Sequence, residues 1–135
     1  MFEHFLELQD RILAIASRAE ALLRSDTKDV ATLGQGRWEV ARALLEYQMF
    51  KHSRIFDPID RAQDGRAAKA RGMKAECLRF GDELRAYVLK WSSLSVVDHW
   101  EQYKPAALEG IARMRAHLAR ERTEIAELLE IKSAA

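Results

Sequence analysis

The chain has 135 residues, and we expect residues 1–135 to form a single domain around one hydrophobic core. With 22 basic and 21 acidic residues the net charge is only +1, so composition gives no general attraction to nucleic acid or to an anionic membrane. No apolar run is long enough to span a membrane, we do not expect the N-terminal residues to act as a signal peptide, and a single cysteine excludes an internal disulfide. We therefore expect a cytoplasmic protein with neither nucleic acid nor a membrane among its partners.

The first half of the chain predicts two amphipathic helices. Ala, Leu, Glu and Arg are abundant, and these residues are strong helix formers. The first helix is predicted from about Phe2 to Arg24, where apolar residues recur with a period of 3.6. The second is secure from about Gly36 to Asp57, with a start nearer Lys28 left open by Gly34 and Gly36, and Pro58 is expected to end it. Residues 59–72 are rich in Arg and Lys and predict a solvated connection.

The second half predicts two further helices. The third runs from about Met73 to Trp91 and is followed by a serine-rich break. The fourth runs from Val96 to about Lys132, and Pro105 is expected to kink or split it. Four amphipathic helices with short connections predict an all-α chain folded as an up-down-up-down four-helix bundle.

A histidine lies in the middle of the apolar stripe predicted for the second helix. This stripe consists of Trp38, Ala41, Leu45, Gln48, Met49, His52, Ile55 and Phe56. An imidazole on a buried face needs a hydrogen-bond partner or a metal. Two interpretations therefore stay open for His52: a core histidine satisfied by protein groups, or a metal ligand.

The fourth helix carries His117 and Glu121 one helical turn apart, so a cation could bind between their side chains. The same spacing is also common for solvated surface pairs. If the second and fourth helices face each other, His52, His117 and Glu121 form a candidate metal site. Cys77, on the inward face of the third helix, is expected to be a small apolar core residue. The sequence contains no phosphate-binding loop and no Ser-His-acid set. We therefore expect a protein that is not an enzyme, although the sequence leaves this open.

The segment from Leu45 to Pro58 resembles the second helix of the hemerythrin-like (HHE cation-binding) domains. That helix carries a leucine-rich lead, a histidine, a glutamate one turn later and a Phe-Pro ending. His52 and Pro58 match this pattern, whereas Phe56 stands in the position of the glutamate. The segment 107–129 resembles the family's fourth helix, with His117 and Glu121 on its His and Glu positions.

The resemblance is incomplete in the other two helices. Glu76 and Cys77 stand where the family often has Glu-His in the third helix, and His4 or Gln9 could lie at the level of the first-helix histidine. Members of the family bind a non-haem di-iron centre through histidines and bridging carboxylates. The resemblance implies a bundle whose metal-ligand set is depleted.

Our leading hypothesis is a hemerythrin-like bundle that acts by binding, without a cofactor, as a regulatory or structural module. Its ligand would be a small molecule in the apolar centre or a protein partner. The alternative is a non-haem iron or other metal protein that binds or senses oxygen or nitric oxide through His52, His117 and Glu121. A third hypothesis is an oligomerisation module, such as a homodimer, in which helix faces pair between chains.

Overall fold

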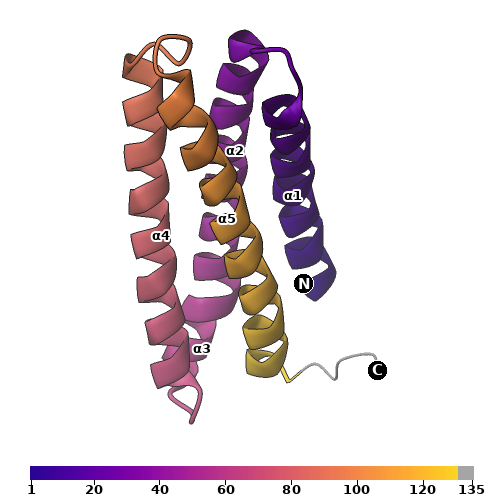
Figure 1. Cartoon of the computed structure of the whole chain (residues 1–135). Helices are drawn as coiled ribbons and strands as arrows, with labels where there is room; N and C mark the ends of the chain where they lie inside the picture. Colours follow the sequence, from indigo (N-terminus) through magenta and orange to yellow (C-terminus); the bar gives the residue numbers. More distant parts are fainter. Residues whose placement is uncertain (131–135) are drawn as a thin grey trace.

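The computed structural model describes residues 1–130, and every secondary-structure element in that part is helical, as predicted. The four long helices lie side by side in Figure 1: α1 (Phe2–Arg24), α2 (Val30–Lys51), α4 (Ala67–Ser93) and α5 (Trp100–Leu128). Two short elements continue α2 towards its C-terminal end: the π-helical turn η1 (His52–Phe56) and α3 (Asp57–Ala62). Within residues 1–130 no helix combines the length and the apolar character needed to cross a membrane.

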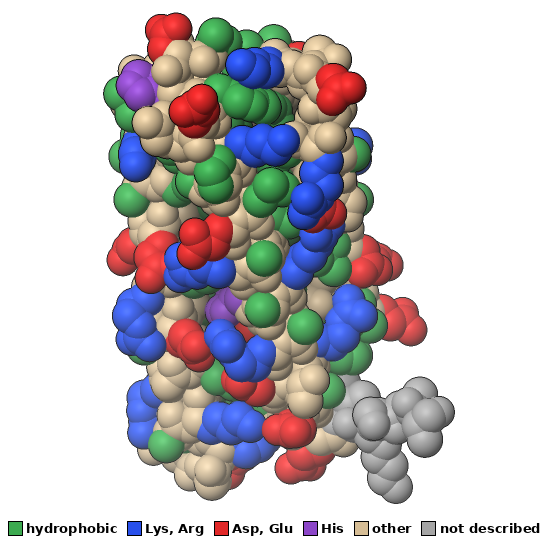
Figure 2. Space-filling view, viewed as in Figure 1, with side chains coloured by type: hydrophobic (Ala, Val, Ile, Leu, Met, Phe, Trp, Pro, Cys, Tyr) green, Lys and Arg blue, Asp and Glu red, His purple; other side chains and the backbone are tan. Residues whose placement is uncertain are grey.

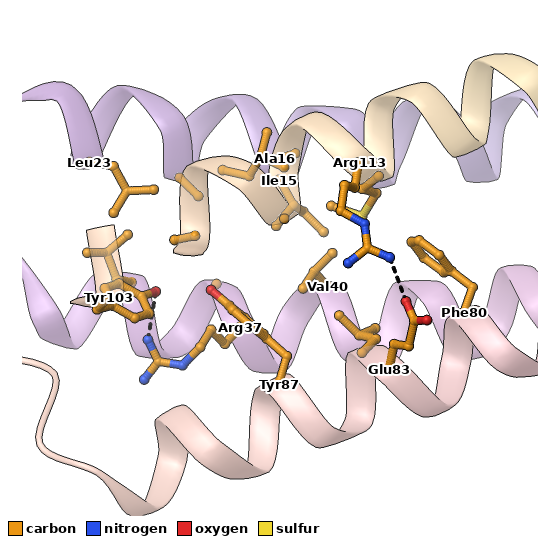
Figure 3. Close-up of a pocket in the computed structure, with 18 residues that line it drawn as sticks. Ile15, Ala16, Leu23, Arg37, Val40, Phe80, Glu83, Tyr87, Tyr103 and Arg113 are labelled. Atoms are coloured by element: carbon orange, nitrogen blue, oxygen red, sulfur yellow. Dashed lines mark hydrogen bonds and ion pairs between the residues drawn. The ribbon is translucent and has the colours of Figure 1, made fainter. Parts of the chain in front are cut away.

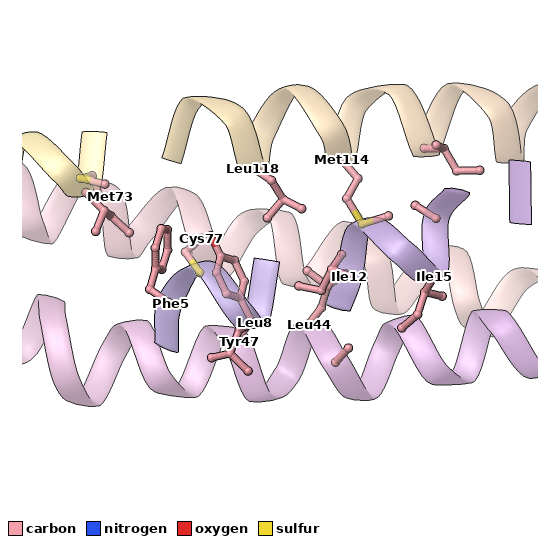
Figure 4. Close-up of a cluster of buried hydrophobic side chains, with 14 of the residues drawn as sticks. Phe5, Leu8, Ile12, Ile15, Leu44, Tyr47, Met73, Cys77, Met114 and Leu118 are labelled. Atoms are coloured by element: carbon pink, nitrogen blue, oxygen red, sulfur yellow. The ribbon is translucent and has the colours of Figure 1, made fainter. Parts of the chain in front are cut away.

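The four long helices enclose one core. Helix α1 packs against α2 and α5, and α2 also packs against α4. In Figure 1 the α1–α2 and α4–α5 connections lie at one end of the molecule, and α3 leads into α4 at the other end. Figure 4 shows large apolar side chains from all four helices meeting between them, among them Ile12, Leu44, Cys77 and Leu118. Each large buried side chain contributes roughly 1.5–3 kcal/mol of hydrophobic stabilisation, which opposes the chain entropy lost on folding.

Charges of both signs are mixed over the surface. Figure 2 shows blue and red side chains interspersed over the face in view, with hydrophobic side chains between them. Many of these charges form ion pairs between helices, such as Arg11 with Glu46 at 2.6 Å and Arg120 with Glu76 at 3.2 Å. Exposed pairs of this kind contribute little to stability, and no block of one sign dominates the face shown.

The second helix starts near Lys28, the earlier of its two predicted starts, and its helical path runs past the predicted C-terminal end. It begins at Val30, because the side chain of Asp29 accepts a hydrogen bond from the backbone N–H of Thr32 at 3.2 Å and so caps the helix. The prediction that Pro58 ends the helix was wrong, since helical structure continues through η1 and α3 to Ala62.

The π-helical turn explains how Pro58 fits inside this helical path. A proline has no N–H for the carbonyl of the residue four positions earlier, and its ring crowds that carbonyl. Just before Pro58, the Asp57 N–H bonds to the carbonyl of His52, five residues back. This wider turn adds one residue per turn locally, and it lets the consecutive residues Ile55 and Phe56 both be buried.

The predicted solvated connection over residues 59–72 is mostly helical. Only residues 63–66 lie between α3 and α4, and Gln63 ends α3 in the left-handed conformation with φ 52°. Helix α4 begins six residues before the predicted Met73, and buried Ala67 and Ala70 pack its first turns onto the core. Small apolar residues among arginines and lysines were therefore misread as linker.

The predicted buried stripe of the second helix was displaced by about one residue. Trp38, Leu45 and Met49, expected to be inside, are exposed by 49%, 51% and 62%. The buried face instead carries Leu33, Ala43, Leu44, Tyr47 and Lys51. Since one residue corresponds to 100° around an α-helix, this displacement decides whether position 51 or position 52 points into the bundle.

The last helix continues through Pro105 without interruption, so the predicted split is not observed. Pro105 lies in the second turn of α5, where its missing N–H leaves one intrahelical hydrogen bond unformed. The kink stays a prediction. The predicted end of this helix at Lys132 lies outside the described residues.

Candidate functional site

Four polar or charged side chains are buried in the half of the bundle nearer the α3–α4 connection. Gln9 comes from α1, Lys51 from α2, and His117 and Glu121 from α5, and they are exposed by 0%, 1%, 7% and 4%. Burial of ionic groups is unfavourable unless they are paired and hydrogen-bonded. Together with Tyr47 and Cys77, these residues form what we call the polar cluster.

The Lys51 ammonium lies at the centre of the polar cluster. Its Nζ is 2.8 Å and 2.7 Å from the two carboxylate oxygens of Glu121, and 3.1 Å from the Cys77 Sγ. The same nitrogen lies 4.2 Å from the centre of the Tyr47 ring. An ammonium has three N–H donors, and these contacts use all of them.

Glu121 is the common acceptor. Its Oε1 accepts hydrogen bonds from the Tyr47 hydroxyl at 2.9 Å and from His117 Nε2 at 3.1 Å, in addition to Lys51. Burial alone would raise the pKa of the carboxyl group. The hydrogen bond from His117 and the charge of Lys51 outweigh burial and lower the pKa of Glu121 to about 2. The carboxylate is therefore ionised throughout the physiological range.

Gln9 connects α1 to the rest of the polar cluster through hydrogen bonds. Gln9 Nε2 donates to the Tyr47 hydroxyl at 2.9 Å and to the Leu118 carbonyl at 2.8 Å, while Arg122 Nε donates to Gln9 Oε1 at 3.0 Å. Burial, and next the charge of Glu121, raise the pKa of Tyr47, so its hydroxyl keeps its proton. Every polar group of this chain of contacts has a protein partner.

His117 is fixed in orientation by its neighbours. Its ring stacks on Phe80 with centroids 4.3 Å apart and planes within 6° of parallel. Arg120 lies 3.4 Å from His117 Nδ1, and an arginine can only donate. The hydrogen that Glu121 accepts is thus on Nε2 of the imidazole.

The structure brings together two of the three predicted metal ligands. His117 and Glu121 are adjacent and buried, whereas His52 lies at the start of η1, half-buried, with its ring 5.8 Å from that of Phe56. Its Nε2 is a buried atom without a hydrogen-bond partner. Burial, followed by the charges of Lys51 and Lys74, lowers the pKa of His52, which favours the neutral ring.

The donors of the polar cluster do not fit a di-iron centre. Both carboxylate oxygens of Glu121 are bonded to the Lys51 ammonium, and a cation in that position would repel a metal ion. Burial raises the pKa of the Cys77 thiol despite the nearby ammonium, so this sulfur stays protonated and is a poor ligand. Among residues 1–130, no group of three His, Cys, Asp or Glu side chains is arranged to hold a metal ion.

A cavity of about 140 Å³, open on one side, lies in the other half of the bundle and is lined by residues of α1, α2, α4 and α5. Figure 3 shows its lining, which is mostly apolar and includes Ile15, Leu23 and Val40. Two of its charged residues, Arg113 and Glu83, pair with each other at 2.8 Å. An apolar hollow with a few polar groups at its edge is the usual form of a small-molecule site.

Arg37 supplies the remaining charge in the cavity lining. Its Nη1 donates to the Tyr103 hydroxyl at 2.9 Å, and its Nη2 donates to the Trp91 carbonyl at 3.3 Å. The guanidinium also lies over the Tyr103 ring, 5.3 Å from its centre. In Figure 3 Arg37, Tyr103 and Tyr87 lie together at one end of the cavity.

A second hollow of about 280 Å³ lies between α2 and α4 and reaches the side of the polar cluster at Lys51 and Cys77. Exposed Trp38 and Leu45 form part of its outer wall. Gly81 lets the Gln48 side chain approach the α4 backbone closely, because a Cβ there would lie 2.9 Å from Gln48 Nε2.

No family model matches the chain, and neither a curated protein nor a solved structure is significantly similar to it. The assignment of a function therefore depends on the chemistry of these sites. Sequence reasoning missed Gln9, Tyr47 and Lys51 as members of one cluster. The spacing of Leu44, Tyr47, Lys51 and Ile55 is a regular three-four-four pattern, but lysine is not expected in a core position.

Proposed function

We propose that this chain is a binding protein for a small, mainly apolar molecule, which it holds in the cavity between the four long helices. The observation that supports the proposal most directly is the cavity itself, with an apolar lining from α1, α2, α4 and α5. Its volume of about 140 Å³ is similar to that of an apolar protein cavity known to bind benzene, roughly 150 Å³. The proposal includes an up-down-up-down arrangement of hemerythrin-like type and assigns no catalytic step.

The contrast between the two interior sites favours the cavity as the place of binding. In the polar cluster Lys51 and Glu121 satisfy each other, and a ligand would have to break buried charge-assisted hydrogen bonds to enter. A ligand in the cavity breaks no buried ion pair. It removes apolar surface from water, which stabilises the complex by about 25 cal/mol per Å².

The proposal can be tested with an uncharged aromatic probe. Fluorine NMR of 4-fluorotoluene should show saturable binding to the unmodified chain. Leu84→Trp puts a larger side chain into the cavity and should weaken binding roughly tenfold or more, a change of about 1.4 kcal/mol.

Leu89→Trp is the matched control, because Leu89 lies on the same helix, is 66% exposed and does not line the cavity. This variant should bind the probe as the unmodified chain does. Absence of saturable binding at millimolar probe, or equal loss in both variants, would overturn the proposal.

The alternative function, an iron protein for oxygen or nitric oxide, is favoured by one observation: His117 and Glu121 are buried and 3.1 Å apart. Lys51 is bonded to the same carboxylate. We therefore predict that the chain, after anaerobic reconstitution with ferrous iron and desalting, retains far less than one iron per molecule. Metal analysis by mass spectrometry measures this directly. Stoichiometric iron that is lost in His52→Ala and in Glu121→Ala would instead establish the alternative.

A further inference from the structure

Arg37 is a cation without an anionic partner at the edge of the cavity. Both of its hydrogen-bond acceptors, the Tyr103 hydroxyl and the Trp91 carbonyl, are uncharged. In the part of the chain that the structure describes, no carboxylate lies within 4.0 Å of its guanidinium. Its Nε is buried and has no hydrogen-bond partner at all.

We propose that the cavity ligand carries a carboxylate, and that this carboxylate binds the guanidinium of Arg37. The inference rests on the proposed function and adds the chemical class of the ligand. A buried N–H without an acceptor costs about 1–3 kcal/mol, and a partly buried guanidinium favours an anion nearby. A carboxylate at the guanidinium would supply the missing negative charge, and a shift of the Arg37 side chain towards it would give the buried Nε an acceptor.

The other charges of the cavity lining do not serve this role. Arg113 and Glu83 neutralise each other through their 2.8 Å contact, so the lining keeps the single positive charge of Arg37. The Tyr103 hydroxyl and ring hold the guanidinium in place. Such preorganisation reduces the entropy that arginine loses when it binds a planar anion.

The volume of the cavity limits the size of the ligand. A volume of about 140 Å³ suits one aromatic ring or a short branched chain, whose apolar part would lie among Val40, Leu84 and Ile111. The geometry thus points to a small aromatic or short aliphatic carboxylic acid, with its acid group at Arg37 and its apolar part between α2, α4 and α5.

The test compares two probes that differ in the acid group, 4-fluorophenylacetate and 4-fluorotoluene, by fluorine NMR titration. The unmodified chain should bind the acid roughly tenfold or more tightly than the uncharged probe, because charge-assisted hydrogen bonds to arginine are strong. Arg37→Met should abolish this preference, so that the ratio of the two affinities falls to about one whatever the change in the cavity lining does to both probes. Arg37→Lys keeps the charge but lacks the planar guanidinium, so it should recover only part of the preference.

Arg42→Met serves as the matched control, since Arg42 lies on the same helix, is exposed and does not line the cavity. It should keep the preference for the acid. Binding of 4-fluorotoluene without any preference for the acid would overturn this inference and leave the proposed function standing. A preference that survives Arg37→Met would also overturn it, and failure of both probes to bind would overturn the proposed function itself.

Discussion

Replacement of Lys51 by methionine is expected to lower the free energy of unfolding by about 3–5 kcal/mol, the usual cost of breaking a buried ion pair from one side. Methionine fills a similar volume but carries no charge. It would leave the Glu121 carboxylate, only 4% exposed, with Tyr47 and His117 as its remaining partners. Urea denaturation at pH 7, followed by circular dichroism, measures the change.

Two comparisons separate this effect from a general response to losing a lysine. Lys69→Met removes an ion pair with Glu127 in which both side chains are largely exposed, 45% and 62%, and should change stability by less than about 0.5 kcal/mol. The double variant Lys51→Met with Glu121→Leu removes both buried charges and should recover most of the lost stability. A loss below about 1 kcal/mol in Lys51→Met would show that the pair is not buried in solution.

The helical elements could be predicted from sequence because composition and period determine them locally. Helix α1 was predicted at its observed bounds, Phe2–Arg24. The errors in the predicted buried face arose where a polar residue is buried in the core or an apolar residue is exposed to solvent. Trp38 and Met49 look like core residues by type, yet both are exposed, while Lys51 is buried. A burial pattern based on residue type cannot place a lysine inside, because its partner lies 70 residues away in sequence.

The candidate site was predictable only in part for the same reason. The spacing of His117 and Glu121 places them on one side of α5, where their side chains lie 3.1 Å apart, and the metal site that they suggested stays a prediction. The third predicted ligand, His52, is one residue out of register with the inward position. Gln9, considered for the first helix only through a family resemblance, does reach the polar cluster through Tyr47. The cavity and the unpaired Arg37 depend on the distance between helices, which no local pattern encodes.

The two interior sites differ in how their polar groups are paired. The buried polar atoms of the polar cluster have protein partners, whereas Arg37 Nε beside the cavity has none, and neither has Nε2 of the half-buried His52 in η1. Buried polar networks that are fully paired make a structure more specific and rigid. Natural proteins tend to depart from complete satisfaction at sites of function. By this criterion the polar cluster holds α1, α2, α4 and α5 in register, and the unpaired Arg37 supports our proposal that a ligand binds in the cavity beside it.

The polar cluster should also make stability depend steeply on pH in acid. The pKa of Glu121 is lowered from 4.5 to about 2, so its ionised form contributes stability that is fully present above about pH 5 and is lost as the pH falls towards 2. A shift of that size corresponds to a loss on the order of 3 kcal/mol. Urea denaturation at a series of pH values between 7 and 2 would record it.

Glu121→Gln isolates this contribution from that of the other acidic residues, because it keeps the shape of the side chain but cannot ionise. At pH 7 the variant should be clearly less stable than the unmodified chain, since Lys51 loses its buried counterion. As the pH approaches 2 the carboxyl group of the unmodified protein takes up a proton and becomes equivalent to the amide. The two stability curves should therefore converge at low pH, and parallel curves over the whole range would show that Glu121 is not paired with Lys51 in the folded protein.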